Sequence, residues 1–362
     1  MNNEYYMNFA INLAKYTKGQ TNPNPPVGAV LVKNNQIVGY GTHLFAGGSH
    51  AERVAIEVAG EQAEGSTLFL TLEPCNHHGK TPPCTDLIIE KGIKKVVIGA
   101  IDPNPQVSSK GIKKLKSQGI KVEVGILENE CNELLDAFSH YITTKRPYVT
   151  IKTAVSLDGK MATAYGESKW ISNAESRKDT HTLRHESSAI LVGVETVIKD
   201  NPSLTSRLEF GGKNPIRIIL DSDLRIPLSS KVLTDNEATT IILTRKENDN
   251  FYLGTNVKVV GLENGPYDIS EVVNYLGEQQ IMSLLVEGGA KVISNFMKSR
   301  IYNRVIVYEA PIIIGGEGLS PFQDFKINSI SQSLEYDLKE VKQIKDNIKK
   351  TFIKKEELYA TN

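Results

Sequence analysis

The sequence predicts an α/β protein of two domains, and three features of the chain carry this prediction. Its 362 residues exceed the usual size of one domain, and a hydrophobic content of 40% can supply two cores. In both halves, short β-rich runs alternate with amphipathic helical patterns, which is typical of α/β folds. Between the halves, a polar stretch ends in Pro147, which cannot continue a helix.

The first half reads as a regular alternation of helices and strands. Helical patterns are expected near residues 4–16, 51–59, 85–91, 110–118 and 128–143. Strand patterns are expected at 27–33, 67–72, 95–99 and 121–124. Strands that alternate with helices predict a largely parallel sheet covered on both faces.

The stretch Thr144-Lys145-Arg146-Pro147 is followed at once by a β-like run over 148–154. We therefore expect domains at 1–145 and 146–362. In the second domain, strands are expected at 189–193, 216–221, 240–244, 257–260, 283–287 and 304–309, and helices near 175–185 and 290–299. The charged segment 338–358 is interpreted as terminal strands or a solvated edge.

Charge, hydropathy and cysteine content restrict the class of protein. Lysine and arginine total 42, as do aspartate and glutamate, and no long run of either sign occurs, so no large positive face for nucleic acid is expected. No apolar run approaches about 18 residues, which argues against a membrane span. A cytoplasmic protein is expected. Three cysteines argue against a disulfide framework and favour metal ligation or catalysis.

One group of residues has the composition of a hydrolytic zinc site. His50 opens a helical pattern, Cys75 follows the strand at 67–72, and Cys84 lies nine positions further on. One imidazole and two thiolates provide three ligands and leave a fourth coordination position open. Glu52, two residues after His50, is placed to act as general acid and base without ligating the metal.

The spacing of the two cysteines departs from the common signature. Zinc nucleobase deaminases have His-x-Glu followed by Pro-Cys-x-x-Cys, whereas eight residues separate Cys75 from Cys84 here. Two alternatives therefore stay open at this point. The combination could occur by chance, or the zinc site could be a closed structural one in which His77 or His78 fills the fourth position.

The loop Pro74-Cys75-Asn76-His77-His78-Gly79-Lys80-Thr81-Pro82-Pro83-Cys84 resembles that of the bifunctional riboflavin-biosynthesis deaminase–reductases. The resemblance implies a cytidine deaminase-like α/β/α domain that removes a ring amino group from a diamino-ribosylamino-pyrimidinone phosphate. It also implies that His50, Cys75 and Cys84 bind zinc and that Glu52 shuttles the proton.

Further positions of the first domain resemble the family's pyrimidine and phosphate pocket. Amide side chains can recognise a pyrimidinone edge, and cationic side chains can pair with a phosphate. The alternative is that the Asn-Pro and Asp-Pro pairs at these positions simply form turns. The expected substrate contacts are Asn24, His43, Lys80, Asp102 and Asn104.

The residues of the second domain indicate a phosphate site outside the Rossmann pattern. No G-x-G-x-x-G follows a strand. The run 283–292 instead leads from an apolar strand through Gly288-Gly289 into a helical pattern, whose first N–H groups can hold phosphate. Thr244-Arg245-Lys246 could meet the phosphate that distinguishes NADPH from NADH. A plain connector and a solvated loop are the respective alternatives.

The resemblance extends to the second domain and implies a dihydrofolate reductase-like α/β fold that uses NADPH to reduce a ribosyl group to ribityl. Carried over position by position, the cofactor contacts are Ala154, Trp170, Thr196, Asp200, Ser222, Gly289, Ala290, Lys291, Val292, Ile293, Ser294 and Asn295. The substrate contacts are Ser168, Arg184, Leu204, Arg207 and Glu287. A homo-oligomer is also implied.

Hydride transfer needs alignment and one proton donor, because the cofactor supplies the reactive group. Lys152, Asp200 and Glu287 are the candidate catalytic residues of this domain. Outside its Gly-Glu-Ser-x-Trp context, Trp170 would be interpreted as a core residue. Cys131 lies on an apolar helical pattern and is assigned no role.

Two other functions share parts of this pattern. A nucleic-acid editing deaminase with an accessory domain would use the same zinc chemistry, but the balanced charge and the lack of a basic, aromatic-interleaved stripe argue against it. A zinc-stabilised protein that merely holds a nucleotide is the non-enzymatic alternative. Small pyrimidine ribotides are thus the expected partners.

Overall fold

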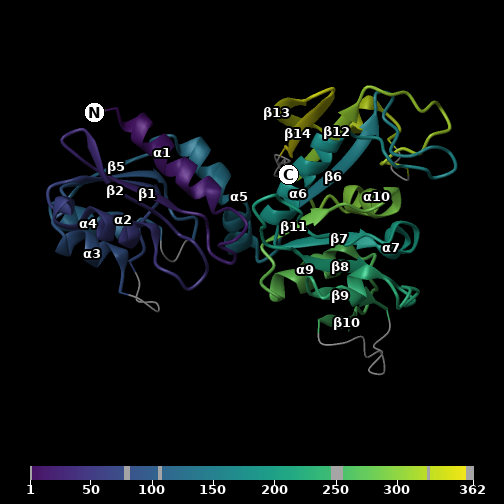
Figure 1. Cartoon of the computed structure of the whole chain (residues 1–362), viewed down its shortest axis with the longest axis horizontal. Helices are drawn as coiled ribbons and strands as arrows, with labels where there is room; N and C mark the ends of the chain where they lie inside the picture. The colour runs from purple at the N-terminus through teal and green to yellow at the C-terminus, as the bar shows by residue number, and fades with distance from the viewer. Residues whose placement is uncertain (1, 77–81, 105–107, 246–255, 324–326, 356–362) are drawn as a thin grey trace, which may run out of the picture. The chain divides into compact units, whose positions relative to one another are not determined.

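The structure is a computed structural model that describes residues 2–76, 82–104, 108–245, 256–323 and 327–355. The chain divides into two compact units, Met1–Lys145 and Arg146–Asn362 (Figure 1). Each unit has its own sheet and its own hydrophobic core. The two units are therefore described separately.

The first unit has a five-stranded sheet in the order β2-β1-β3-β4-β5. The strands are β1 (Gly28–Lys33), β2 (Gln36–Thr42), β3 (Thr67–Leu72), β4 (Lys95–Ala100) and β5 (Lys121–Val124). The expectation of a largely parallel sheet is wrong here, because β1 is antiparallel to both β2 and β3. Asn34 and Asn35 adopt positive φ values of 52° and 61°, so they form a tight hairpin turn that the helix–strand alternation did not reveal.

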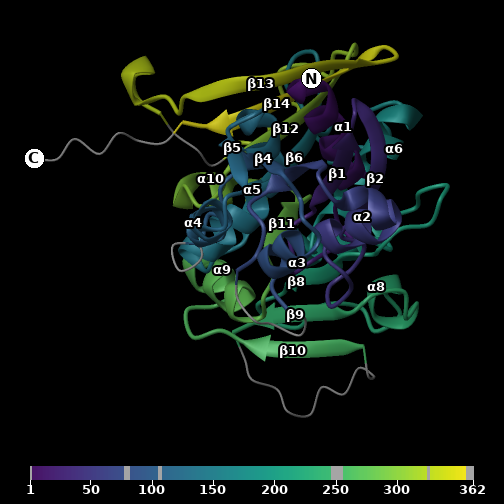
Figure 2. The ribbon, with the colours of Figure 1, turned by 90° about the vertical axis from the view of Figure 1, so that its left-hand side faces the viewer.

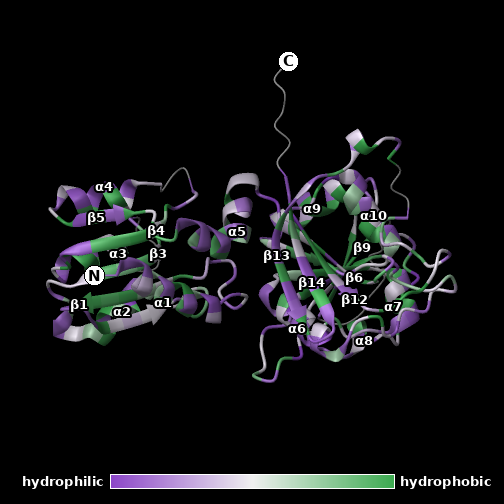
Figure 3. Ribbon diagram, turned by 90° about the horizontal axis from the view of Figure 1, so that it is seen from above, coloured by the Kyte–Doolittle hydropathy of each residue, from purple (hydrophilic) through white to green (hydrophobic). Residues whose placement is uncertain are grey.

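Helices cover both faces of this sheet. One face packs against α1 (Asn3–Tyr16) and α5 (Glu128–Thr144), and the other packs against α2 (Ala51–Ala59), α3 (Cys84–Glu90) and α4 (Lys110–Ser117). Successive residues of β1 alternate between the two layers: Leu31 contributes to the α2 side, whereas Val30 and Val32 contribute to the α1 side. Strands β1 and β4 are accordingly hydrophobic along their length (Figure 3). The unit is an α/β/α sandwich.

The second unit has a nine-stranded sheet in the order β10-β9-β8-β7-β11-β6-β12-β14-β13. All pairings from β10 to β12 are parallel, and only β14 and β13 add antiparallel partners. Figures 1 and 2 show β10 at one end of this sheet and the β13–β14 hairpin at the other. The strands are β6 (Tyr148–Ser156), β7 (Ala189–Gly193), β8 (Ile216–Leu220), β9 (Thr240–Thr244), β10 (Val257–Gly261), β11 (Ser283–Val286), β12 (Arg304–Ala310), β13 (Tyr336–Ile344) and β14 (Asn347–Lys354).

The two faces of the second sheet bury different helices. Helices α9 (Ile269–Glu278) and α10 (Ala290–Ser299) pack on the core that contains Ile151 and Val286. Helices α7 (Val194–Asp200) and α8 (Lys231–Thr234) pack on the opposite core. Helix α6 (Ala174–Glu186) contributes buried polar side chains to the unit. The sequence patterns did not predict α7, α8 and α9.

The edge strand β13 is almost fully exposed and hydrophilic, as expected for a solvated edge (Figure 3). Among the helices of the described residues, none has both the length and the apolar character needed to cross a bilayer.

Candidate functional sites

The predicted zinc donors meet at the ends of three elements of the first unit. His50 is the N-cap of α2, Cys75 follows β3, and Cys84 is the first residue of α3. The donor atoms lie within 4.8 Å of one another. His50 Nδ1 lies 3.5 Å from Cys75 Sγ and 3.4 Å from Cys84 Sγ. Cys75 after β3 and Cys84 at the start of α3 therefore lie close together, although eight residues separate them in the sequence.

The donor triangle fits a zinc ion. A tetrahedral zinc with Zn–S bonds of about 2.3 Å and Zn–N bonds of about 2.0 Å separates a bound nitrogen from a bound sulfur by about 3.5 Å. Both observed N–S distances agree with this value. One imidazole and two thiolates are also ligands that zinc prefers in proteins.

The electrostatics of the two thiols indicate a site that favours negative sulfur. A hydrogen bond from Cys84 outweighs the opposing effect of burial and, together with His50 and the Cys84 backbone N–H, lowers the pKa of Cys75 to about 4. The same hydrogen bond, together with burial, raises the pKa of Cys84, because one proton is held between the two sulfurs. A bound cation would take the place of that proton.

Glu52 lies in the first turn of α2, two residues beyond the His50 ligand. Its side chain is buried, and this burial raises the pKa of its carboxyl group above the ordinary value. A carboxyl group with a raised pKa beside a metal site can both accept and donate a proton near neutral pH. The position and the protonation behaviour therefore suit a general acid and base.

His43 and Asn24, two predicted substrate contacts, form a pair next to the metal donors. The His43 ring lies edge-on to the His50 ring, with 5.6 Å between centroids. His43 Nδ1 lies 3.0 Å from the Ser49 carbonyl oxygen, so Nδ1 carries the proton and Nε2 accepts from the Asn24 amide at 3.0 Å. Burial lowers the pKa of His43, which leaves it neutral. His43 thus orients Asn24 and is poorly suited to pairing with a phosphate.

Two other predicted contacts, Asp102 and Asn104, form a turn in which the Asn104 N–H donates to Asp102 Oδ1 at 2.8 Å. The turn-forming interpretation of this segment therefore holds for its backbone. Lys80, together with His77 and His78, lies outside the described residues.

Glu73, which the sequence reasoning did not select, connects this turn to the metal site. Its buried carboxylate accepts backbone N–H groups from both sides of the turn and from the start of α4, at 2.9–3.3 Å. The donors are Asp102, Ser109, Gly111 and Ile112. Because Glu73 immediately precedes Pro74-Cys75, one side chain links the ligand segment to the Asp102 turn. The sequence feature that could have pointed to Glu73 is its position immediately before Pro74-Cys75.

In the second unit, three predicted residues form a buried ion cluster. Glu287 follows β11, whose last residue pairs with Ile151, so Glu287 lies beside Lys152 on β6. Arg184 of α6 grips the Glu287 carboxylate with Nε at 2.8 Å and Nη2 at 3.1 Å. Lys152 Nζ lies 3.8 Å from the same carboxylate. Glu287 is thus shared between two cations.

The protonation states of this cluster follow from burial and charge. Burial alone would raise the pKa of Glu287, but Arg184 and Lys152 outweigh it and lower this pKa to about 2. Burial lowers the pKa of Lys152, and the Glu287 carboxylate opposes this effect. Glu287 is therefore an anion, and Lys152 is an ammonium group that gives up its proton more readily than an ordinary lysine.

The predicted substrate contacts Leu204 and Arg207 lie next to this cluster. The loop between them presents the Thr205 carbonyl oxygen to Arg184 Nη1 at 3.1 Å. Arg207 is exposed, and its Nη2 lies 3.4 Å from His181 Nε2 on α6. Ser168 lies in an exposed loop, and no contact places it in the cluster.

The turn between β11 and α10 fits a phosphate cradle. Gly289 is the N-cap of α10, and a Cβ atom there would meet only Thr196 Oγ1, at 4.0 Å. Ser222 Oγ and Ser294 Oγ are buried without a hydrogen-bond partner among the described residues. Open space at the N-terminus of α10 suits an anionic cofactor.

The remaining predicted cofactor contacts differ in what they offer. Val292 and Ile293 point into the hydrophobic core, so any contact there would come from the backbone. Lys291 Nζ lies over the Tyr267 ring, 5.0 Å from its centroid.

The predicted contacts outside α10 are largely exposed or paired. Trp170 is 68% exposed and is stacked by Arg177, whereas Asp200 forms an ion pair with Lys169. Ala290 and Asn295 belong to α10, and Ala154 is part-buried on β6.

The Thr244–Arg245 segment, predicted to meet the extra phosphate of NADPH, lies beside Ser222. Thr244 Oγ1 donates to the Ser222 carbonyl oxygen at 3.0 Å, and the Arg245 N–H approaches the same oxygen at 3.4 Å. Lys246 lies outside the described residues.

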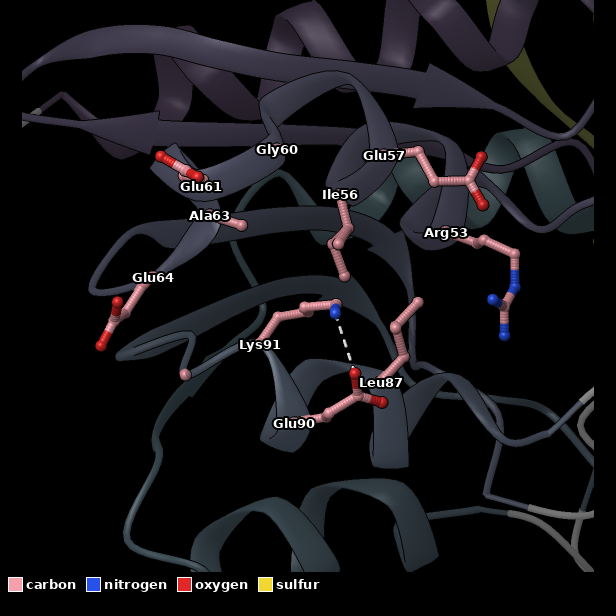
Figure 4. A pocket seen from close by; sticks show the side chains of 11 residues that line it. Arg53, Ile56, Glu57, Gly60, Glu61, Ala63, Glu64, Leu87, Glu90 and Lys91 are labelled. Atoms are coloured by element: carbon pink, nitrogen blue, oxygen red, sulfur yellow. Dashed lines mark hydrogen bonds and ion pairs between the residues drawn. The ribbon is translucent and has the colours of Figure 1, made fainter.

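A separate groove lies over α2, the 3-10 turn η1 (Gly60–Ala63) and α3 (Figure 4). Its charged lining includes Arg53, Glu57 and the Lys91–Glu90 ion pair of 2.8 Å. Neither the zinc donors nor Glu52 line it. The groove therefore does not belong to the candidate metal site.

Comparison with known proteins identifies the family. The chain is 50% identical to the riboflavin biosynthesis protein RibD of Aquifex aeolicus over 95% of this chain and 96% of that protein. The chain belongs to the RibD family. Within it, residues 1–100 match the cytidine and deoxycytidylate deaminase zinc-binding region, and residues 147–350 match the RibD C-terminal domain. The predicted family and fold class are confirmed.

Solved structures agree over nearly the full length. Acinetobacter baumannii RibD is 37% identical, with a TM-score of 0.89 over 98% of this chain and 99% of that one. The diaminohydroxyphosphoribosylaminopyrimidine deaminase/5-amino-6-(5-phosphoribosylamino)uracil reductase of Thermotoga maritima is 42% identical, with a TM-score of 0.89 over 97% and 98%. Because these relatives match both units, they favour two enzymatic activities over the editing and nucleotide-holding alternatives.

Proposed function

We propose that the chain catalyses two consecutive reactions of riboflavin biosynthesis. The first is hydrolytic deamination of 2,5-diamino-6-(5-phosphoribosylamino)pyrimidin-4(3H)-one by residues 1–145. The second is NADPH-dependent reduction of the ribosyl group of 5-amino-6-(5-phosphoribosylamino)uracil to ribityl by residues 146–362. The observation that carries the proposal is the His50, Cys75 and Cys84 donor triangle in a chain that also contains the RibD C-terminal domain.

In the deamination, His50, Cys75 and Cys84 hold zinc, which when bound supplies the Lewis acidity that activates water. Glu52 accepts a proton from the attacking water and delivers it to the leaving amino group, a role that its raised pKa supports. Asn24, oriented by His43, contacts the pyrimidinone. Asp102, Asn104 and Lys80 are the further proposed substrate contacts.

In the reduction, the Gly289 turn and the α10 N-terminus hold NADPH, which when bound supplies the hydride. Ala154, Trp170, Thr196, Asp200 and Ser222 also contact this cofactor. Arg184, whose guanidinium binds Glu287, and the exposed Arg207 bind the sugar phosphate. Ser168 and Leu204 are the further proposed substrate contacts. Lys152 is placed to donate a proton or a hydrogen bond to the ribose, and the Glu287 carboxylate at 3.8 Å favours its charged form.

The resemblance to the family supports a proposal for the partners and the setting of the enzyme. We propose that the chain acts on these small ribotides as a homo-oligomer in the cytoplasm. Sedimentation velocity of the purified protein tests the oligomer, and a sedimentation coefficient of a 40.0 kDa monomer at micromolar concentration would contradict it.

One experiment tests both activities. The purified protein is incubated with the diamino-pyrimidinone ribotide, with and without NADPH, while ammonia and NADPH absorbance are followed separately. We expect ammonia release in both cases and NADPH oxidation after the deaminated product has formed.

Two single variants assign each activity to its unit. Glu52→Gln should abolish ammonia release while zinc stays bound, and Lys152→Met should abolish NADPH oxidation while ammonia release persists. Full ammonia release by Glu52→Gln would refute the deaminase mechanism. NADPH that stays unoxidised by the unaltered enzyme, even when the deaminated product is supplied, would refute the reductase assignment.

A further inference from the structure

The strand register of the second unit gathers three side chains on one face of the sheet. Tyr308 on β12 pairs with Ala154 on β6 and with Lys349 on β14. Paired residues share a face, and Lys152 lies two residues before Ala154, so it points to the same side. Lys152, Tyr308 and Lys349 therefore lie side by side across three adjacent strands.

Helix α6 covers this face with an acidic partner. The Tyr308 hydroxyl donates to Asp179 Oδ2 at 2.5 Å, and Lys349 Nζ donates to the same oxygen at 2.7 Å. Tyr308 is only 1% exposed. A buried ring that is tied at its hydroxyl end to a charged pair has one fixed orientation.

The tyrosine ring in turn lies against the Lys152 ammonium. Lys152 Nζ is 5.5 Å from the ring centroid, within the range of a cation–π contact. Its carboxylate neighbour Glu287 is 3.8 Å away, longer than a normal hydrogen bond, and is already gripped by Arg184. The ring thus holds the ammonium without using its N–H donors.

We propose that Tyr308, anchored by Asp179 and Lys349, is a positioning residue that keeps the N–H donors of Lys152 available to the reductase substrate. This inference rests on the proposed reductase function. Asp179 and Lys349 also form an ion pair at the hydroxyl end of the ring, and Lys349 Nζ lies 5.8 Å from the ring centroid. Because their charges are opposite, this pair holds Tyr308 without adding net charge near Lys152.

The other charged groups around Lys152 are compatible with this role. They are Glu287 after β11 and, on α6, Arg184, His181 and Asp179, with Lys349 on β14. Burial by itself would raise the pKa of Asp179, but hydrogen bonds from Lys349 and Tyr308 keep it below its ordinary value. Burial raises the pKa of Tyr308, so its hydroxyl stays a neutral donor.

Removing one or the other member of the Asp179–Lys349 pair should shift the pKa of Lys152 in opposite directions. Asp179→Asn leaves the Lys349 charge unbalanced, which disfavours the Lys152 ammonium. The alkaline limb of the reductase kcat/KM profile should then move to lower pH, by about one unit. Lys349→Met leaves the Asp179 charge unbalanced and should move this limb to higher pH. The Asp179→Asn/Lys349→Met double variant should return it to its original position.

The ring itself is tested by a matched pair of variants. Tyr308→Phe keeps the ring and loses the hydroxyl, whereas Tyr308→Leu loses the ring. We expect Tyr308→Leu to lower reductase kcat about tenfold, with little change in the KM for NADPH, and Tyr308→Phe to lower kcat by a smaller factor. Urea unfolding followed by the fluorescence of Trp170, the single tryptophan, which lies in the same unit, reports on correct folding in every variant.

A second readout does not depend on turnover. Carbamylation of Lys152 by cyanate, measured by peptide mass spectrometry as a function of pH, follows the neutral amine and should show the same opposite shifts. Shifts in one direction for both single variants, or a double variant that fails to compensate, would overturn the inference. Opposite shifts in carbamylation without any NADPH oxidation would support the positioning role and refute the reductase assignment instead.

Discussion

The two candidate sites of this chain differ in how far apart their residues lie in the sequence and in how their charges are paired. The metal site of the first unit takes its donors from residues 50–84, and two of them begin helices. The ion cluster of the second unit joins Arg184 to Glu287 across 103 positions and adds Lys152 from a neighbouring strand. The first site needs an external cation for its thiol groups, whereas the second pairs its two cations with a carboxylate of the chain itself.

Because the two sites are built differently, different changes should disrupt the activity of the first unit and the stability of the second. A site whose donors wait for a metal depends on that metal for activity. A site made of buried, mutually paired charges depends on all its members for stability, because removal of one leaves another charge buried alone. The two units should therefore respond differently to metal removal, to loss of a charged partner and to acid.

Zinc removal should separate the two units completely. After prolonged treatment with a strong chelator, we expect ammonia release to fall to background because the donor triangle has lost its cation. NADPH oxidation with supplied deaminated product should remain. Added zinc should restore ammonia release. Equal loss of both activities would mean that the second site depends on the metal as much as the first, which would contradict the prediction.

Arg184→Met should destabilise the second unit by about 3–5 kcal/mol, because it leaves the Glu287 carboxylate buried without its bidentate partner. Urea unfolding followed by the fluorescence of Trp170, the single tryptophan, measures this loss. The matched control is Lys178→Met on the same helix, which removes an exposed ion pair with Glu209 and should cost at most about 1 kcal/mol. Similar losses for both variants would contradict the prediction.

Acid should weaken the second unit through Glu287. The pKa of this carboxyl group is lowered to about 2 in the folded chain, from an ordinary value of 4.5. Its stabilising contribution is therefore fully present above pH 4.5 and disappears as the pH falls towards 2, on the order of 3 kcal/mol in total. Glu287→Gln should flatten this part of the unfolding free energy against pH. An unchanged slope would show that another group is responsible.

Glu73→Gln should produce the smallest of these effects, within the first unit. The neutral side chain loses charge-assisted hydrogen bonds from backbone N–H groups, at a cost of about 2 kcal/mol. Faster hydrogen exchange at Gly111 and Ile112 and a higher KM for deamination should result. NADPH oxidation should not change. The exposed Glu61→Gln is the control, and protection that is equal in both variants would argue against an anchoring role.

Local patterns were sufficient for most helices and strands, because the apolar periodicity that defines them is written in consecutive residues. They failed for β2, where two asparagines turn the chain into a hairpin, and for α9, whose pattern was not recognised. The parallel sheet expected for the first unit failed for the same reason: strand direction depends on the connection and not on the strand.

Among side chains that interact with residues far away in the sequence, some were predicted and others were missed. His50, Cys75 and Cys84 were predicted as one donor set because metal ligation restricts residue type and spacing, and the structure brings them together. Glu73, Tyr308 and Asp179 were missed, because a buried carboxylate or tyrosine carries no mark of its partner in the sequence.

Residue types and short spacings were enough to predict the α/β class, the His50, Cys75 and Cys84 donor set with its adjacent carboxyl group, and the family resemblance. The folded chain was needed to show that His43 hydrogen-bonds Asn24, that Glu287 is shared by two cations, and that Tyr308 contacts Lys152 as well as the Asp179–Lys349 pair. Strand register and helix packing place these groups together, and their burial sets how strongly the charges act on one another.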